Sequence, residues 1–182
     1  MHVALFFTEQ QYNLIRLHLF KGKKEQGCFL FVSSTIDSPS IELKVKDIHK
    51  VEAYGWSHQS GCHLELEEKE KVKVMLKARE YACDLIECHS HRFDGSATFS
   101  PSDVHGLSEF VQYIWWKLPG KIYGAVVFTK SDIRGRIWLP KQDKPVSISE
   151  IKVIDSTGNF KTVGKAPIKK SLFNIFKRWN NG

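Results

Sequence analysis

Four apolar runs, each too short for a buried helix, constrain the fold of this 182-residue chain most strongly. They lie within residues 2–7 (HVALFF), 25–36 (EQGCFLFVSSTI), 82–91 (ACDLIECHSH) and 121–129 (KIYGAVVFT). Short apolar runs rich in aromatic and β-branched residues are typical of buried strands. The sequence therefore predicts a central sheet. RIWLP, after the turn KSDIRG, is expected to pair back on the last of these strands as a hairpin.

Three segments between the strands carry helical signals. Residues 8–22 place apolar side chains at helical spacing, with Thr8 as the N-cap and Gly22 as the stop. Residues 66–81 are charged and helix-forming, and their expected inner face consists of Val72, Leu76 and Tyr81. Residues 100–120 show the strongest helical period: apolar positions recur every three or four residues from Val104 to Leu118, and Pro119-Gly120 ends the helix.

The order of these elements predicts an α/β (mixed α+β) protein, with a central mixed sheet flanked by helices. Residues 55–63 are expected to form a loop, and residues 140–165 offer one strand, SEIKVID. We expect one domain over residues 1–155 and a basic amphipathic tail over 156–182. One helical face of that tail could dock on the domain, a membrane surface or a partner; it consists of Ile168, Leu172, Ile175, Phe176 and Trp179.

Composition narrows the class of protein. Apolar residues make up 42% and charged residues 26%, as in globular proteins, and no apolar run reaches the length of a transmembrane helix. The N-terminus lacks the features of a secretory signal, so a cytoplasmic location is expected. Six basic residues and no acidic one fall within 161–178, whereas the rest is nearly balanced, so nucleic acid is not an expected partner. Cys28, Cys83 and Cys88 lie in apolar runs and are expected to be reduced, buried thiols.

Residues 87–103 (ECHSHRFDGSATFSPSD) combine three potential metal ligands. His89 and His91 share one face of a strand because side chains alternate with a period of two. Asp103 falls in the first turn of the next helix. Two nitrogens, one oxygen and a water make the open tetrahedral arrangement of catalytic zinc. A structural explanation is equally available: Ser100, Pro101 and Asp103 form a capping box, and the histidines simply face solvent.

HSHRFDGSATFSPSD resembles the metal motif of the JAMM (MPN+, JAB-type) metalloproteases, in which H-x-H precedes S-x-x-D by about ten residues. The glutamate that this family places far upstream matches Glu25 in EQGCFLF. The likeness covers residues 1–140 and implies an MPN/JAB-like fold. It implies that His89, His91 and Asp103 ligate one Zn²⁺ per chain. Glu25 would deprotonate the attacking water and protonate the leaving amine, and Ser100 would donate a hydrogen bond to the oxyanion.

The resemblance implies a hydrolase, namely a deubiquitinase-like isopeptidase that cleaves after the C-terminal glycine of ubiquitin or a ubiquitin-like protein. A bacterial ubiquitin-like pathway with E1- and E2-like conjugation proteins would supply its partners. Alternatives are a peptidase that processes sulfur-carrier proteins and a non-catalytic MPN binding module. The chain departs from the family by Arg92 after the second histidine, by an eleven-residue gap before Asp103 and by Gly27-Cys28 after the glutamate. Arg92 and Asp94 are expected to pair with each other or with a substrate tail.

Three further features leave two explanations each. His58 and His63 flank a loop near Cys62 and form either a second metal site or two surface histidines. His105 lies close after Asp103 and could support the ligands. In the pair Trp115-Trp116 one ring belongs to the apolar stripe, and the other lies beside it, where it could meet a partner.

Overall fold

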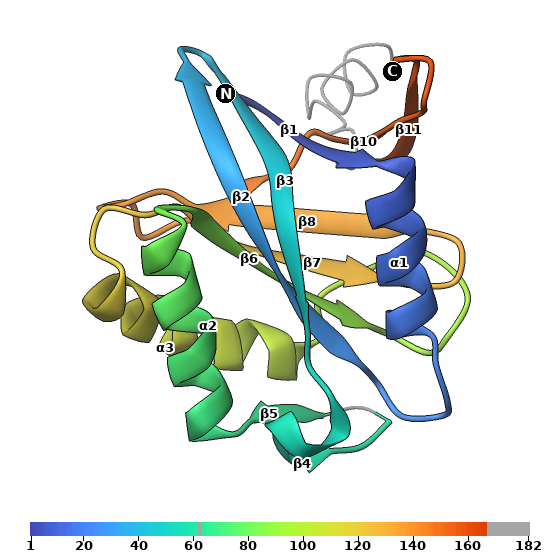
Figure 1. Ribbon diagram of the computed structural model, residues 1–182, viewed down its shortest axis with the longest axis vertical. Helices are drawn as coiled ribbons and strands as arrows, with labels where there is room; N and C mark the ends of the chain where they lie inside the picture. Colours follow the sequence, from blue (N-terminus) through green and yellow to red (C-terminus); the bar gives the residue numbers. More distant parts are fainter. Residues whose placement is uncertain (62, 167–182) are drawn as a thin grey trace, which may run out of the picture.

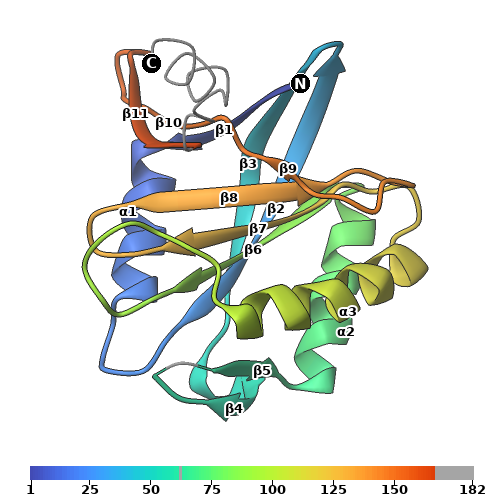
Figure 2. The same ribbon diagram turned by 180° about the vertical axis from the view of Figure 1, so that it is seen from behind.

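The computed structural model describes residues 1–61 and 63–166, and its central feature is a nine-stranded mixed sheet with three helices (Figures 1 and 2). The strands follow the order β11-β10-β1-β3-β2-β6-β7-β8-β9. Three pairs are parallel, β1 with β10, β1 with β3 and β6 with β7, and the others are antiparallel. The expected mixed α+β class is therefore confirmed.

The elements have the following bounds. The strands of the large sheet are β1 (His2–Thr8), β2 (Gly27–Asp37), β3 (Ser40–Lys50), β6 (Asp84–Ser90), β7 (Tyr123–Phe128), β8 (Ile133–Trp138), β9 (Val146–Ser147), β10 (Glu150–Ile154) and β11 (Phe160–Lys165). A separate hairpin consists of β4 (Trp56–Gln59) and β5 (Leu64–Leu66), preceded by the short helix η1 (Ala53–Gly55). The helices are α1 (Glu9–Leu19), α2 (Glu68–Glu80) and α3 (Pro101–Lys117).

The apolar runs form strands because the sheet is buried on both faces. Along β2, Leu30 and Val32 pack with Ile15 and Leu19 of α1. Phe29 and Phe31 point the other way, into a second core that α2 and α3 cover. Figures 1 and 2 show α1 on one side of the sheet, and α2 and α3 on the other. A strand with a helix on each face needs apolar side chains at every position, which is why no polar alternation is visible in these runs.

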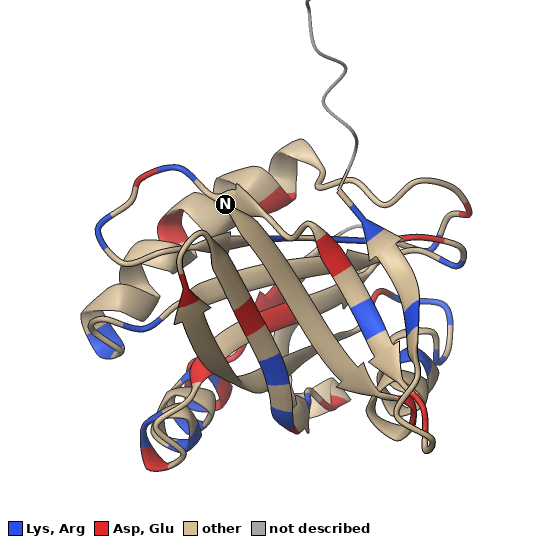
Figure 3. Cartoon of the chain, turned by 90° about the horizontal axis from the view of Figure 1, so that it is seen from above, with Lys and Arg blue, Asp and Glu red and all other residues tan. Residues whose placement is uncertain are grey.

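The sheet is strongly curved, as the view from above shows (Figure 3). Its curvature brings β11 against β8, although six other strands separate them in the sheet order. At the contact, a Cβ atom on Gly164 would lie 2.5 Å from the carbonyl oxygen of Ile133. Glycine is required there because the two backbones approach too closely for any side chain.

The helix boundaries follow the capping signals. Thr8 accepts a hydrogen bond from the Gln11 backbone N–H (3.2 Å), and the Gln11 side chain accepts one from the Thr8 N–H (2.9 Å), which makes a reciprocal capping box. The expected core thiols are also confirmed, because Cys28, Cys83 and Cys88 are buried and free.

The predicted inner face of α2 was wrong. Val72, Leu76 and Tyr81 are exposed, whereas Val74, Met75 and Ala78 are buried. Glu70 is buried on the same face because its carboxylate pairs with His49 of β3 at 2.5 Å. The prediction followed the large apolar side chains of α2. The face that packs on the sheet instead contains the small Ala78 and Glu70, whose carboxylate is paired with His49. Val104 of α3 is likewise exposed, against expectation.

Two segments expected to be irregular contain strands. Residues 55–63, expected to be a loop, contribute β4, and Phe160–Lys165 forms β11. Pairing of β11 with β10 extends the sheet beyond residue 155. The hydrophobic face predicted for the tail lies outside the described residues. None of the helices in the described part of the chain combines the length and apolar character that a membrane crossing requires.

Candidate metal centre

The two histidines are placed by the pairing of β6 with its neighbours. β6 lies between β2 and β7, and its antiparallel register with β2 sets His89 opposite Gly27. Beyond the end of β6, the His91 backbone N–H donates to the Phe128 carbonyl at 2.8 Å. His89 and His91 therefore keep the alternation of a strand and lie on the same face, with ring centroids 5.0 Å apart.

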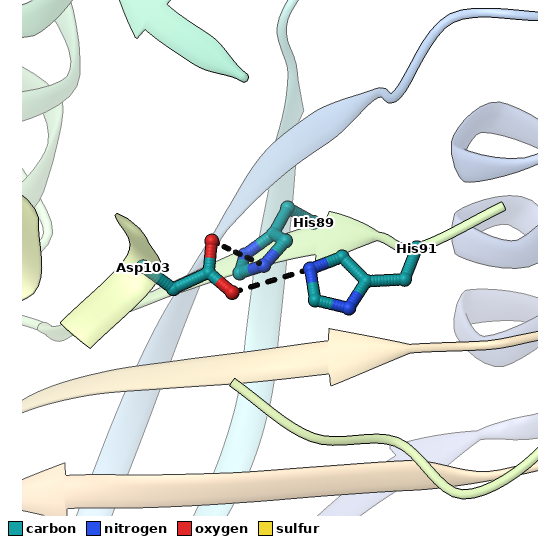
Figure 4. A group of neighbouring side chains, drawn as sticks. All are labelled: His89, His91 and Asp103. Atoms are coloured by element: carbon teal, nitrogen blue, oxygen red, sulfur yellow. Dashed lines mark ion pairs between the residues drawn. The ribbon is translucent and has the colours of Figure 1, made fainter. Parts of the chain in front are cut away.

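The acid comes from the first turn of α3. Asp103 is the third residue of that helix, and its backbone N–H donates to the Ser100 hydroxyl at 3.1 Å. The carboxylate accepts a hydrogen bond from the Ser100 backbone N–H at 2.6 Å. The capping box expected from the sequence is thus present, and it aims the Asp103 carboxylate at the strand that carries the histidines (Figure 4).

The three side chains converge on one point. The His89 Nε2 atom lies 3.5 Å from Asp103 Oδ1, and the His91 Nε2 atom lies 3.2 Å from Asp103 Oδ2 (Figure 4). All three ligand atoms fall within 4.8 Å of one another, so the group could hold a metal ion. The two explanations of Asp103, a helix cap and a metal ligand, are therefore compatible. The residue caps α3, and its carboxylate faces the imidazoles with which it could hold a metal ion.

Two details fit a bound cation better than a simple hydrogen-bonded cluster. Charge-assisted N–H···O bonds are about 2.7–2.9 Å long, which is shorter than the 3.2 and 3.5 Å seen here. A tetrahedron with metal–ligand bonds of about 2.1 Å has edges of about 3.4 Å. Moreover, the buried Nε2 atom of His89 has no hydrogen-bond partner within the part of the chain described. Buried polar atoms without a partner are rare, and an unseen ion is one of the usual reasons.

The charges around the site keep the Asp103 side chain in its anionic form. Burial alone would raise the pKa of Asp103, but the contacts with His89 and His91 hold it far below its usual range. Burial would lower the pKa of His89, but the carboxylates of Asp103, Glu87 and Glu25 outweigh it and raise the pKa. Asp103 is therefore ionised, and a cation bound here would compete with protons for the His89 ring.

Glu25 lies two residues before β2, close enough to His89, His91 and Asp103 for their charges to act on its carboxyl group. Its backbone N–H donates to the Ser60 carbonyl at 2.9 Å, and its carbonyl accepts from the Gln59 side chain at 2.8 Å. The side chain is buried, which raises its pKa, while the charges of His89 and His91 partly oppose that rise. A carboxyl group with a raised pKa is suited to accept and return a proton near neutral pH.

A cavity of about 520 Å³ opens onto these groups and includes Glu25, His89 and Asp103 in its wall. The β4–β5 hairpin and β2 line one side of the cavity, and α3 lines the other. Its apolar surface includes Phe29, Trp56, Leu64, Leu66, Leu107, Phe110 and Tyr113. Trp56 can lie there because Gly27 has no side chain: a Cβ atom on Gly27 would be 2.7 Å from the indole ring.

Ser100 is near Asp103 but does not line this cavity, whereas Ser102 does. Arg92 and Asp94 do not pair with each other. The Arg92 guanidinium donates to the carbonyls of Leu19 and Gly22 at the end of α1. Asp94 accepts from the Ser131 hydroxyl at 2.5 Å. Both side chains therefore fix the loop that follows the histidines.

Glu87 is a site residue that the sequence reasoning missed. It precedes His89 by two positions on β6, so both side chains share a face, and it lines the same cavity. The Tyr123 hydroxyl donates to its carboxylate, and burial raises the pKa of Glu87. An acidic residue inside an otherwise apolar strand was the signal that could have identified it.

The remaining sequence candidates are not part of the group formed by His89, His91 and Asp103. His58 and His63 lie on the β4–β5 hairpin with ring centroids 5.2 Å apart, and Cys62 is outside the described residues. His105 is exposed at the edge of the cavity and lies 3.8 Å from the Glu109 carboxylate. Trp115 packs against the core, whereas Trp116 is exposed, as their positions on the predicted stripe suggested.

Comparisons with known proteins add little. No protein-family model matches the sequence, and no match was found among curated proteins. Among solved structures, the chain is similar to the N-terminal domain of STIL from Trichoplax adhaerens, with 11% identity and a TM-score of 0.41. The similarity covers 76% of this chain and 43% of that one, so the chain spans less than half of the structure it matches. At this identity and TM-score the similarity assigns neither a fold family nor a function.

Proposed function

We propose that this chain is a zinc-dependent peptidase of the JAMM (MPN+) type. It would hydrolyse the peptide or isopeptide bond after the C-terminal glycine of ubiquitin or a ubiquitin-like protein. One observation carries the proposal. His89, His91 and Asp103 bring their ligand atoms within 4.8 Å of one another, and Glu25 lines the cavity onto which His89 and Asp103 open.

The donor set supports zinc as the cation. Imidazole nitrogens and a carboxylate oxygen are ligands that Zn²⁺ accepts, and three protein ligands leave a fourth position for water, as in catalytic zinc sites. A zinc ion held there would act as a Lewis acid and lower the pKa of water from 15.7 to about 7.

Two residues of the chain, Glu25 and Ser100, would then have separate roles in the reaction. Glu25 would accept a proton from the attacking water and return it to the leaving amine, because its raised pKa makes both transfers feasible near neutrality. The Ser100 hydroxyl would donate a hydrogen bond to the oxyanion, while its lone pairs still accept from the Asp103 N–H. The reciprocal cap keeps Asp103 aimed at the histidines throughout.

The cavity supports an extended tail as the substrate. Among the described strands β5 pairs with β4 alone, so its other edge is open for strand addition by a peptide. A tail lying there would meet the apolar wall formed by Trp56, Leu66 and Phe110 before it reached Glu25. Glycine at its end would pass most easily between the hairpin and α3.

The MPN-like arrangement and the biological setting belong to the same proposal. In its support, a strand with H-x-H (β6) leads into a helix with S-x-x-D (α3), and an antiparallel neighbour (β2) follows the glutamate. The partners would be ubiquitin-like proteins, with E1- and E2-like conjugation proteins of a bacterial system.

Cleavage of fusion proteins tests the proposal. The full chain is incubated with fusions of ubiquitin, ubiquitin-like and sulfur-carrier proteins, with and without a zinc chelator, and products are identified by mass spectrometry. We expect cleavage after the terminal glycine, its loss with chelator and its return with added zinc. Glu25→Gln should reduce the rate by about 10²–10⁴-fold and leave zinc bound, whereas the exposed Glu80→Gln should be unaffected.

The outcomes separate the alternatives. Cleavage that persists after complete removal of zinc would contradict the metal mechanism. Turnover of only the sulfur-carrier fusions would change the substrate class but keep the chemistry. Tight zinc binding without cleavage of any fusion would contradict a peptidase.

A further inference from the structure

A second pair of histidines lies outside the metal centre, on the β4–β5 hairpin. His58 belongs to β4, and His63 immediately precedes β5. Their ring centroids are 5.2 Å apart with an interplanar angle of 52°. In the metal centre the rings of His89 and His91 are 5.0 Å apart with an angle of 56°. The exposed pair thus repeats the geometry of the buried pair.

That spacing is the one expected for two imidazoles on one ion. With Zn–N bonds of about 2.1 Å and a tetrahedral angle, the centroids of two bound rings lie about 5.2 Å apart. Imidazole nitrogens suit Zn²⁺, Ni²⁺ and Cu²⁺, whereas Mg²⁺ and Ca²⁺ prefer oxygen. The separation of the two rings therefore matches that of two imidazoles bound to one borderline divalent cation.

The two rings are also available to an ion. Both residues are exposed, and within the described residues neither imidazole has a hydrogen-bond or ion-pair partner. Glu65 pairs with His58 in the hairpin register, so its side chain shares their face, but its carboxylate does not form a three-ligand group with the two rings. The pair offers a cation two nitrogens, with water for the other positions.

We propose that His58 and His63 bind a second divalent cation, Zn²⁺ in particular, on the β4–β5 hairpin. The ion would bind more weakly than the one at His89, because the hairpin supplies two close protein ligands and the site faces solvent. It would clamp β4 to β5 at the end of the hairpin nearest the cavity, which His63 helps to line.

The clamp has a consequence for Glu25. Ser60 and Gln59 lie between the two histidines in the chain, and both hydrogen-bond the Glu25 backbone. The Ser60 carbonyl accepts from the Glu25 N–H at 2.9 Å, and the Gln59 side chain donates to the Glu25 carbonyl at 2.8 Å. An ion bound to both His58 and His63 would therefore restrain Gln59 and Ser60, which hydrogen-bond the Glu25 backbone. Both histidines would thus act as positioning residues for Glu25.

Zinc stoichiometry tests the site directly. The metal-free full chain is titrated with Zn²⁺ by calorimetry, and bound zinc is counted by elemental analysis after equilibrium dialysis. We expect two equivalents in the wild type and one in His58→Ala/His63→Ala. The control His2→Ala removes an exposed histidine of β1 that belongs to neither histidine pair, and it should keep two. A wild type that binds one equivalent which the double variant keeps, or a double variant that binds as many equivalents as the wild type, overturns the proposal.

Hydrogen exchange tests the link to Glu25. The exchange rate of the Glu25 amide is compared at one and at two equivalents of zinc. The second equivalent should slow exchange about tenfold when free zinc is ten times its dissociation constant. The double variant should show no such change. An unchanged rate in the wild type, with two ions bound, would refute the positioning role while leaving the site itself.

The test does not depend on peptidase activity. Stoichiometry and exchange are measured without a substrate, so the hairpin site can be present in a chain that cleaves nothing. Conversely, a chain that cleaves fusions with a single zinc would uphold the proposed function and remove the second site.

Discussion

Ser100 and Asp103 hold each other by two reciprocal hydrogen bonds at the start of α3. The Asp103 N–H donates to the Ser100 hydroxyl at 3.1 Å, and the Ser100 N–H donates to the Asp103 carboxylate at 2.6 Å. The same carboxylate lies within 3.2 Å of His91 Nε2. One carboxylate thus caps the helix and faces the histidines of the candidate metal centre, and the two contributions can be separated by mutation.

Replacement of Ser100 by alanine should weaken both functions. The variant loses the acceptor for the Asp103 N–H, which should lower the free energy of unfolding by about 0.5–2 kcal/mol. Because the carboxylate is then less firmly held, zinc affinity should fall about 10–100-fold. Chemical denaturation and zinc titration measure the two effects. Ser102→Ala, in the same helical turn, is the control for stability. A lower stability with unchanged zinc affinity would show that the cap does not position the ligand.

Asp103→Asn should remove the charge of the side chain but keep the helix cap on α3. The asparagine oxygen can still accept from the Ser100 N–H, so the cap is kept. The metal-free variant should nevertheless be less stable than the wild type, because it loses the ionised carboxylate that His89 and His91 stabilise. Zinc at 100 times its dissociation constant stabilises a folded protein by about 2.7 kcal/mol, and the variant should lose most of that gain. Melting temperatures with zinc and with chelator measure it, and the exposed Asp143→Asn is the control. An undiminished zinc effect in Asp103→Asn would remove Asp103 from the ligand set.

The main strands and the helices were predictable because burial leaves a local pattern. β7 and residues 27–32 of β2 consist of glycine, cysteine and apolar or aromatic residues, since cores lie on both faces of the sheet there. β11 was missed because it is an edge strand, largely exposed, and lacks such a pattern. The inner face of α2 depended on the pair between Glu70 and His49, a contact between distant segments that no local spacing reveals.

The candidate site was predictable where its geometry is local. The period of a strand places His89 beside His91, and the capping box places Asp103 relative to Ser100. The convergence of these two segments depends on the loop between them, which Asp132 fixes by accepting a hydrogen bond from the Ala97 N–H at 3.0 Å. The same strand period places Glu87 on the face of β6 that carries His89, so this acidic residue in an apolar strand was a signal that the sequence reasoning overlooked.

His18 should make the stability of the metal-free protein sensitive to mild acid. Its Nε2 atom lies 2.9 Å from the Gly27 carbonyl, and burial lowers its pKa below the ordinary value of 6.5. The unfolded chain therefore binds more protons than the folded one as pH drops below about 6.5, and stability is lost over that range. His18→Gln keeps a donor for Gly27 but does not titrate. Urea midpoints at about pH 7.5 and about pH 5.5, with chelator present, should fall less in the variant. Equal losses in both proteins would contradict the role of His18.

Alanine at two glycines beside the cavity should have opposite effects on stability. At Gly27 a Cβ atom would lie 2.7 Å from the Trp56 ring, so Gly27→Ala should lower the free energy of unfolding by about 1–3 kcal/mol. At Gly106, within α3, a Cβ atom meets nothing within 4 Å, and Gly106→Ala should raise it by about 0.5–1 kcal/mol.

A double-mutant cycle identifies the cause of the loss at Gly27. Trp56→Phe removes the indole atoms that the new Cβ would meet, so Gly27→Ala should cost less in that background than in the wild type. Chemical denaturation of the four proteins gives the coupling. If Gly27→Ala costs the same with and without the indole, the cavity wall formed by Trp56 does not rest on Gly27, and the close packing of the hairpin against β2 is not what holds Trp56 beside the metal centre.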